Sequence, residues 1–287
     1  MFAQVKIVSD SEGLRTAGRA EPDAGDGRRR AARRAVLVAG AWYAAFMGLH
    51  VLLAWDSGRV VGTVLPGVGP WLGPVDWAVY AAFAVVAALA TGWRGTGIGV
   101  PPRAGWAALC WAPILAGLPF VLFGWNLDPS SAIPVLGVGI PLVALNEELF
   151  FRGVLLDMLG PLGTRRAVTW SAIAFGASHL VNLVAGSYPP FVVMQVAATT
   201  GGGVALAAIR LRSGSLWPVL GVHLVVDWIA VSTLTGPATA SPILLPVLFG
   251  WLAANLLLWR YGWGLLGGRR AEAPGHTVPD EASEATV

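Results

Sequence analysis

The sequence has one cysteine, one lysine and very little charge outside its two ends. Cys110 has no second cysteine to pair with, so an internal disulfide framework is excluded. Charged residues make up 12% of the chain, against roughly 25% in soluble globular domains. Of these charges, 13 fall in residues 1–34 and 6 in residues 269–287, which leaves 16 for the 234 residues between them. This composition argues against a cytosolic enzyme and predicts a polytopic membrane protein.

Apolar segments recur along the chain at the length of a membrane span, which is roughly 20 helical residues for a hydrocarbon core of about 30 Å. We therefore predict an all-α fold with about eight transmembrane helices in a membrane domain at residues 35–262. The predicted segments are Ala35–Trp55, Val75–Trp93, Ala104–Trp125, Ile133–Leu149, Ala167–Val184, Pro190–Ile209, Leu216–Leu234 and Ile243–Tyr261. The hydrophilic tails at 1–34 and 263–287 are predicted to be disordered.

Arginines follow the second, fourth, sixth and eighth segments, whereas the loops between the other segments carry little or no positive charge. These arginines are Arg94, Arg103, Arg165, Arg166, Arg210, Arg212, Arg260, Arg269 and Arg270. Short cytoplasmic loops accumulate Lys and Arg, so we predict a multi-pass protein of the cell membrane with both termini in the cytoplasm. The net charge of +3 reflects this topology, and the expected environment is a lipid bilayer rather than a nucleic acid.

A small set of ionisable side chains lies inside or beside the predicted spans, where charge is costly and indicates function. The candidates are Glu147, Glu148, Arg152, His179, His223 and Asp227. At 1.5 Å per helical residue, Glu147, His179 and His223 all lie roughly 16–20 Å from the predicted cytoplasmic boundary. We therefore predict one site built by three helices. His50 has no obvious partner in its segment, and we do not place it in the site.

The spacing of these residues separates their predicted roles. Glu148 and Arg152 are four residues apart and can pair on one helix face, either as a structural pair or as part of the catalytic site. Glu147 projects about 100° away, with no cation of its own helix facing it, so it is a candidate general base or cation ligand. His179, His223 and Glu147 also match the ligand types of a zinc site with an open position for water. The predicted metal, if one is bound, is Zn²⁺, and a metal-free mechanism through the glutamate stays open.

Three motifs carry these residues in order along the chain. They are an EExxxR motif at Glu147-Glu148-Leu149-Phe150-Phe151-Arg152, an FxxxH motif at Phe175-Gly176-Ala177-Ser178-His179, and an HxxxN/D motif at His223-Leu224-Val225-Val226-Asp227. Together they resemble the CPBP family, which comprises the type II CAAX prenyl endopeptidases and their bacterial relatives implicated in bacteriocin self-immunity. The resemblance covers roughly residues 133–234.

The resemblance implies an intramembrane endopeptidase. In that family's scheme Glu147 would activate the attacking water, and His179 and His223 would position it or hold a metal. Glu148 and Arg152 would orient the site, with assistance from Asp227. Eukaryotic members carry Asn at this last position, and its amide can donate to an oxyanion, whereas an ionised Asp can only accept. Asp227 is then either protonated, a metal ligand or the partner of a histidine.

Two other classes of function remain open from the sequence: a transporter with a proton or metal-ion relay, and a non-catalytic bacteriocin-immunity protein. The loops after the fifth and seventh segments carry no charge, so we predict that the site opens toward the cytoplasm, which argues against a transport path. Arg-rich, Lys-poor composition is typical of a high-GC bacterium. The expected substrate is therefore a short peptide, a lipoprotein remnant or the end of a membrane protein. The oligomeric state is not predicted.

Overall fold

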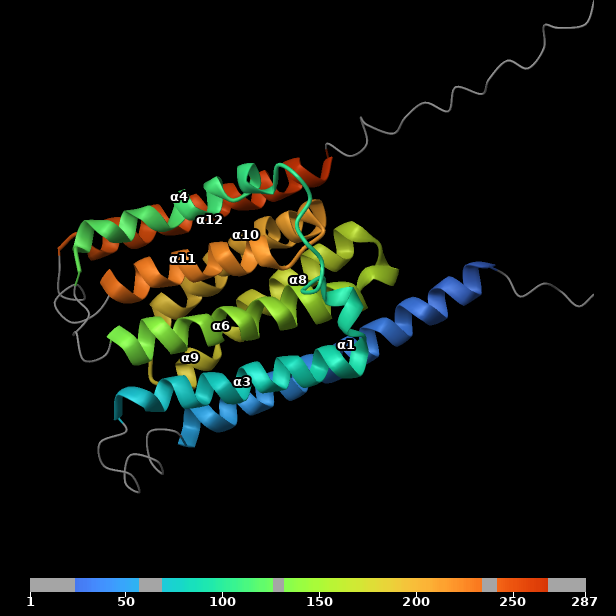
Figure 1. Ribbon diagram of the computed structural model, residues 1–287, viewed down its shortest axis with the longest axis horizontal. Helices are drawn as coiled ribbons and strands as arrows, with labels where there is room; N and C mark the ends of the chain where they lie inside the picture. The colour runs from blue at the N-terminus through green and yellow to red at the C-terminus, as the bar shows by residue number, and fades with distance from the viewer. Residues whose placement is uncertain (1–23, 57–68, 126–131, 234–241, 268–287) are drawn as a thin grey trace, which may run out of the picture.

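The computed structural model describes residues 24–56, 69–125, 132–233 and 242–267. Within these ranges every regular element is a helix, and the helices form an elongated bundle (Figure 1). This confirms the predicted all-α fold. Most of the two predicted tails, residues 1–23 and 268–287, lies outside the described residues.

The elements follow one another along the chain, and those that build the site come from its second half. The first half comprises α1 (Ala24–Asp56), α3 (Gly69–Thr91), the 3₁₀ turns η1 (Trp93–Thr96) and η2 (Trp106–Leu109), α4 (Trp111–Gly117) and η3 (Leu118–Phe123). One unbroken helical stretch then contains η4 (Ala132–Gly139), α6 (Ile140–Glu147), η5 (Glu148–Leu155) and α7 (Leu156–Met158). The last elements are η6 (Gly160–Leu162), α8 (Thr164–Ser178), α9 (Val181–Val184), α10 (Pro189–Ser213), α11 (Trp217–Thr233) and α12 (Leu244–Gly267).

Six helices in the described ranges are long and apolar enough to cross a membrane. Two shorter apolar helices, Trp111–Phe123 and Trp217–Thr233, coincide with the predicted third and seventh segments. The chain is therefore a multi-pass membrane protein, and each of the eight predicted segments falls on a helix.

The helices at the two ends extend beyond the predicted boundaries. Helix α1 begins at Ala24, so residues 24–34 are helical and not part of a disordered tail. Alanine and arginine both favour helix, and Arg30 pairs with Asp26 one turn away at 2.7 Å. Helix α12 likewise continues to Gly267, past the predicted end of the membrane domain at residue 262. Hydropathy marks only the apolar part of a helix, which explains the difference at α1, whereas at α12 the five additional residues are themselves apolar and continue the helix.

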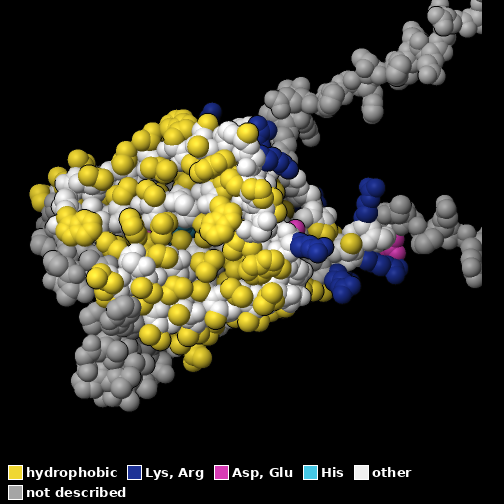
Figure 2. All heavy atoms as spheres, viewed as in Figure 1, with side chains coloured by type: hydrophobic (Ala, Val, Ile, Leu, Met, Phe, Trp, Pro, Cys, Tyr) yellow, Lys and Arg dark blue, Asp and Glu magenta, His cyan; other side chains and the backbone are white. Residues whose placement is uncertain are grey.

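Arginine side chains gather at the end of the bundle where α1 begins and α12 ends, while the sides of the bundle are covered by hydrophobic side chains (Figure 2). We call this the arginine-rich end. The described arginines outside the core are Arg28, Arg29, Arg30, Arg33, Arg34, Arg94, Arg103, Arg165, Arg166, Arg210, Arg212 and Arg260. Their clustering matches the alternation of charge along the sequence.

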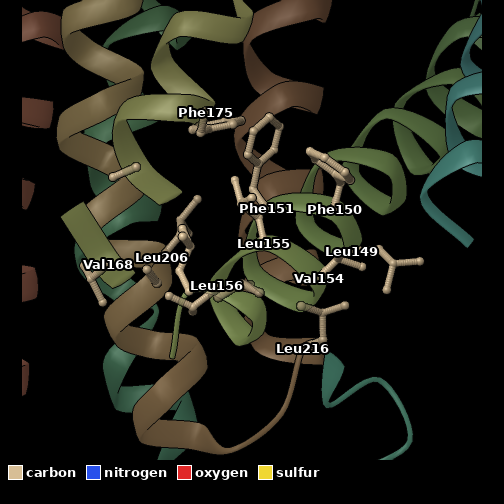
Figure 3. Packing of buried hydrophobic residues seen from close by; sticks show 14 of the residues in the cluster. Leu149, Phe150, Phe151, Val154, Leu155, Leu156, Val168, Phe175, Leu206 and Leu216 are labelled. Carbon is tan, nitrogen blue, oxygen red and sulfur yellow. The ribbon is translucent and has the colours of Figure 1, made fainter. Parts of the chain in front are cut away.

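The EExxxR motif lies on a helix that is packed on every side. All eight residues of η5 are buried, and the segment has the π-helical hydrogen-bond pattern that is frequent at functional sites. Phe150 stacks on Phe46 of α1 with ring centroids 4.3 Å apart, and Phe151 meets the edge of Phe175 of α8 at 5.2 Å (Figure 3). Aromatic contacts of this kind add to the stability provided by buried area, so the motif is anchored against two other helices.

Candidate active site

Glu148 forms the buried base of the site. Its Oε1 accepts a hydrogen bond of 3.0 Å from Nη1 of Arg152 and lies 2.7 Å from Nδ1 of His223 on α11. The side chains of Glu148, Arg152 and His223 are 0%, 1% and 9% exposed. An ionised carboxylate can only accept, so His223 donates from Nδ1, and this bond fixes both the tautomer and the direction of its ring.

The other nitrogen of His223 faces two further carboxylates. Its Nε2 lies 3.2 Å from Oδ2 of Asp227, one turn along α11, and 3.4 Å from Oε2 of Glu147 at the end of α6. These two acids are more exposed than Glu148, with 28% of the Asp227 side chain and 19% of the Glu147 side chain accessible. His223 therefore connects a fully buried acid on one side to two accessible acids on the other.

His179 reaches the same region from the C-terminal end of α8. Its Nδ1 lies 3.0 Å from the carbonyl oxygen of Phe175, and because a carbonyl can only accept, Nδ1 carries the hydrogen. In a neutral ring Nε2 is then an acceptor. The Phe175 ring meets the rings of His179 and His223 edge-on at 5.1 Å and 6.2 Å, and the Arg152 guanidinium lies 3.9 Å from its centroid. The phenylalanine of the FxxxH motif thus packs both histidines and the arginine together.

A cavity of about 500 Å³ adjoins these side chains. Glu147, His179, His223 and Asp227 all line it, and the first three are the residues that were placed at one depth from the sequence. Glu148 and Arg152 lie behind this lining, where they can orient His223 but do not reach a molecule in the cavity.

Several polar residues that we did not predict also line the cavity: His50, Asn146, Ser178, Asn182, Gln195, Thr199 and Asn255. His50 stacks on Tyr80 at 3.7 Å, and its Nδ1 contacts the carbonyl of Phe46 at 2.9 Å. A search for charged side chains passes over amides and hydroxyls, and helix α1 lies far from the motifs in sequence. The one local signal in the sequence is that Asn146 directly precedes Glu147, the residue predicted to lie in the site.

The cavity extends away from the arginine-rich end. It reaches Ala54, near the end of α1, Ala185, which follows α9, and Val231, near the end of α11. These helix ends lie opposite the arginine-rich end (Figure 1). The lining therefore does not confirm the predicted opening toward the cytoplasmic, arginine-rich side. On that side the bulky side chains of η5 fill the bundle (Figure 3), and loop charge carries no information about such packing.

The arrangement was also compared with the ligand requirements of a metal ion. Among the described residues, no three His, Cys, Asp or Glu side chains are placed so that they could hold one ion. Both nitrogens of His223 are in contact with carboxylates, and Nδ1 of His179 is held by a carbonyl. His179, His223 and Glu147 therefore do not form a zinc site in this arrangement, and a metal stays a prediction for experiment.

Comparison with known proteins gives one match. Residues 129–229 match the family model described as type II CAAX prenyl endopeptidase Rce1-like. Neither the curated proteins nor the solved structures give a match. The matched range contains the three motifs and the helices that carry them, which agrees with the resemblance drawn from the motifs alone. The part of the chain that builds the site, residues 129–229, is therefore similar to the type II CAAX prenyl endopeptidases described as Rce1-like.

Proposed function

We propose that this protein is an intramembrane endopeptidase that hydrolyses a peptide bond with a water molecule activated by Glu147. The match of residues 129–229 to the Rce1-like family model supports endopeptidase activity in general. The observation that carries the specific proposal is the position of the Glu147 carboxylate. It lines the cavity and lies 3.4 Å from Nε2 of a histidine whose other nitrogen is held by a buried acid.

The proposed reaction begins with a water molecule held between Glu147 and His179. Glu147 takes one proton from the water, and Nε2 of His179 accepts a hydrogen bond from the remaining O–H and so orients the oxygen toward the scissile carbonyl carbon. The new C–O bond forms a tetrahedral intermediate. The proton held by Glu147 then passes to the peptide nitrogen as the C–N bond breaks, which releases a carboxylic acid and an amine; the acid proton then passes to the amine to give a carboxylate and an ammonium group.

The remaining motif residues act through His223. Glu148, neutralised by Arg152, holds Nδ1 of His223, and Asp227 approaches Nε2 from the next turn of α11. Together they keep the ring of His223 beside Glu147. Glu148 and Arg152 are positioning residues in this proposal, because neither lines the cavity.

The shape of the cavity favours a hydrolase over the transporter that the sequence left open. A proton or ion relay needs a polar route across the membrane. In the described part of the chain, the arginine-rich side of the site is filled by the buried residues of η5, and the polar lining extends toward the other end. The intact acid and histidine contacts equally favour catalysis over an immunity protein with a degenerate site.

The test uses the purified full-length chain in proteoliposomes with a library of quenched fluorescent membrane peptides. Glu147→Gln keeps the side-chain volume but removes the base, so cleavage should fall by at least about 10²-fold, the usual contribution of a general base. Asp26→Asn is the matched control, because Asp26 is an exposed acid on α1, and it should cleave like the wild type. Unchanged cleavage by Glu147→Gln would overturn the proposed role of this glutamate.

A further inference from the structure

We infer that Asn146 is a further catalytic residue, whose side-chain amide donates a hydrogen bond to the oxygen of the scissile carbonyl as negative charge develops on it. This inference rests on the proposed endopeptidase function. It concerns a residue that precedes the EExxxR motif and lies outside all three motifs.

Asn146 is buried and lacks the hydrogen bonds that normally accompany burial. It lies in the last turn of α6, is 2% exposed and lines the cavity. Its Oδ1 has no hydrogen-bond partner, and no hydrogen bond to its side chain is found within the described residues. Buried amides are almost always bonded, because an unbonded one destabilises the fold. The atom that could serve an oxyanion is the donor Nδ2, which has no hydrogen-bond partner within the described residues while the side chain lines the cavity.

Three other neutral polar groups on the cavity wall already use a donor within the protein. Ser178 donates to the carbonyl of Phe175 at 2.6 Å, and Asn182 donates from Nδ2 to Oε1 of Gln195 at 2.9 Å. Thr199 donates to the backbone carbonyl of Gln195 at 2.8 Å. In each case the polar group stabilises the helices around the cavity. Asn146 differs from them because its amide has no such role.

The charged groups of the site do not offer a ready donor either. Ionised Glu147 and Asp227 can only accept, and the Nδ1 hydrogen of His179 is bound to a carbonyl. Nε2 of His223 faces the two carboxylates. A tetrahedral oxyanion needs donors that are already in place before the reaction. The Asn146 amide can meet this need from the wall of the cavity.

The position of Asn146 also suits the geometry of the reaction. Asn146 and Glu147 are consecutive residues on one helix and line the same cavity. A single peptide bond lying along this wall can receive the water activated by Glu147 at its carbon and the Asn146 amide at its oxygen. The two groups then act on the two atoms of the same carbonyl.

The experiment uses full-length protein in proteoliposomes and a peptide that the wild type cleaves. Asn146→Ala should lower kcat by about 10²–10³-fold, which is the usual effect of removing one oxyanion donor, while KM changes by less than about threefold because the substrate ground state is little affected. Asn146→Asp, which keeps the shape but loses the donor, should do the same. Thr169→Ala is the control: it removes an exposed hydroxyl of α8 that lies outside the cavity lining, and its kcat should stay within about threefold of the wild type.

Two further measurements separate catalysis from a structural role. A phosphinate analogue of the peptide, which mimics the tetrahedral state, should lose affinity for Asn146→Ala in proportion to the loss of kcat/KM. The melting temperature of this variant should equal or exceed that of the wild type, because an unbonded buried group has been removed. A lower melting temperature with unchanged phosphinate affinity would overturn the inference.

The outcomes also distinguish this inference from the proposed function. If Glu147→Gln is inactive and Asn146→Ala keeps its kcat, the assignment of Asn146 is wrong and the endopeptidase proposal stands. If Glu147→Gln cleaves normally, the mechanism proposed around Glu147 is wrong, and the assignment of Asn146 falls with it.

Discussion

His223 on α11 lies 2.7 Å, through its Nδ1, from Oε1 of Glu148 on η5. This bond joins the first and the last of the three motifs, which are 75 residues apart in the chain. The Glu148 side chain is fully buried and also binds Arg152 at 3.0 Å. Because Glu148 is fixed in this way, it sets the orientation of the His223 ring from a position outside the cavity. The orientation of His223 at the cavity therefore depends on two residues that do not line it.

A double-mutant cycle should reveal this dependence. Glu148→Gln and His223→Gln should each lower kcat/KM, and the double variant should lose less than the product of the two effects, because Glu148 has no ring to orient once His223 is replaced. The expected coupling is about 0.5–3 kcal/mol in activation free energy. Strictly multiplicative losses would show that the two residues act independently.

Arg152 should be important for the stability of the fold. Arg152→Ala leaves the carboxylate of Glu148 buried without its cation, and removing one partner of a buried pair costs about 3–5 kcal/mol. We expect a clear drop in the melting temperature of the detergent-solubilised protein.

Arg30→Ala is a matched control for Arg152→Ala. Arg30 and Asp26 form a pair with the same four-residue spacing, but their side chains are 81% and 54% exposed, and exposed pairs contribute about 0–1 kcal/mol. The control should melt like the wild type. A similar loss in the two variants would contradict the argument from burial.

The side from which the cavity is reached can be measured with cysteines in a Cys110→Ala background. Ala185→Cys lies at the far end of the cavity, and Thr164→Cys lies at the start of α8 beside the arginine-rich end. A membrane-impermeant thiol reagent should label the two from opposite sides of sealed vesicles. Bound peptide should protect Ala185→Cys only. Labelling of both from one side would place the cavity opening at the arginine-rich end instead.

Metal removal should leave activity largely intact. Within the described ranges no three ligand side chains converge on one ion, so treatment with a chelator, verified by elemental analysis, should not abolish cleavage. Loss of activity that Zn²⁺ restores would show that His179, His223 and Glu147 come together around a metal in the working enzyme.

Several features were predictable from the sequence because they depend on short stretches of chain. Apolar segment lengths located the helices, and counting residues along them identified Glu147, His179 and His223 as side chains at one depth, which do line one cavity. The pairing of Glu148 with Arg152 followed from their four-residue spacing and is present at 3.0 Å. The start of α1 at Ala24 was missed because its first turns are polar.

Other features depend on how each helix is rotated about its own axis, which residue counting does not report. The bond between Glu148 and His223 and the approach of His50 to the cavity are of this kind. The unbonded amide of Asn146 belongs with them, because its state depends on which neighbours lie within reach. None of these contacts has a signature within one helix.

The sequence by itself determined that this chain crosses a membrane and that its arginines lie between particular apolar segments. It also identified the acids and histidines that lie in apolar helices, where an ionisable side chain indicates a function. These properties follow from the composition of segments about 20 residues long, which the thickness of the bilayer selects. Only the tertiary structure decided which half of the bundle is hollow. Packing of the bulky residues of η5 fills the arginine-rich side of the site, and the cavity lies on the other side, between α6, α8, α10 and α11.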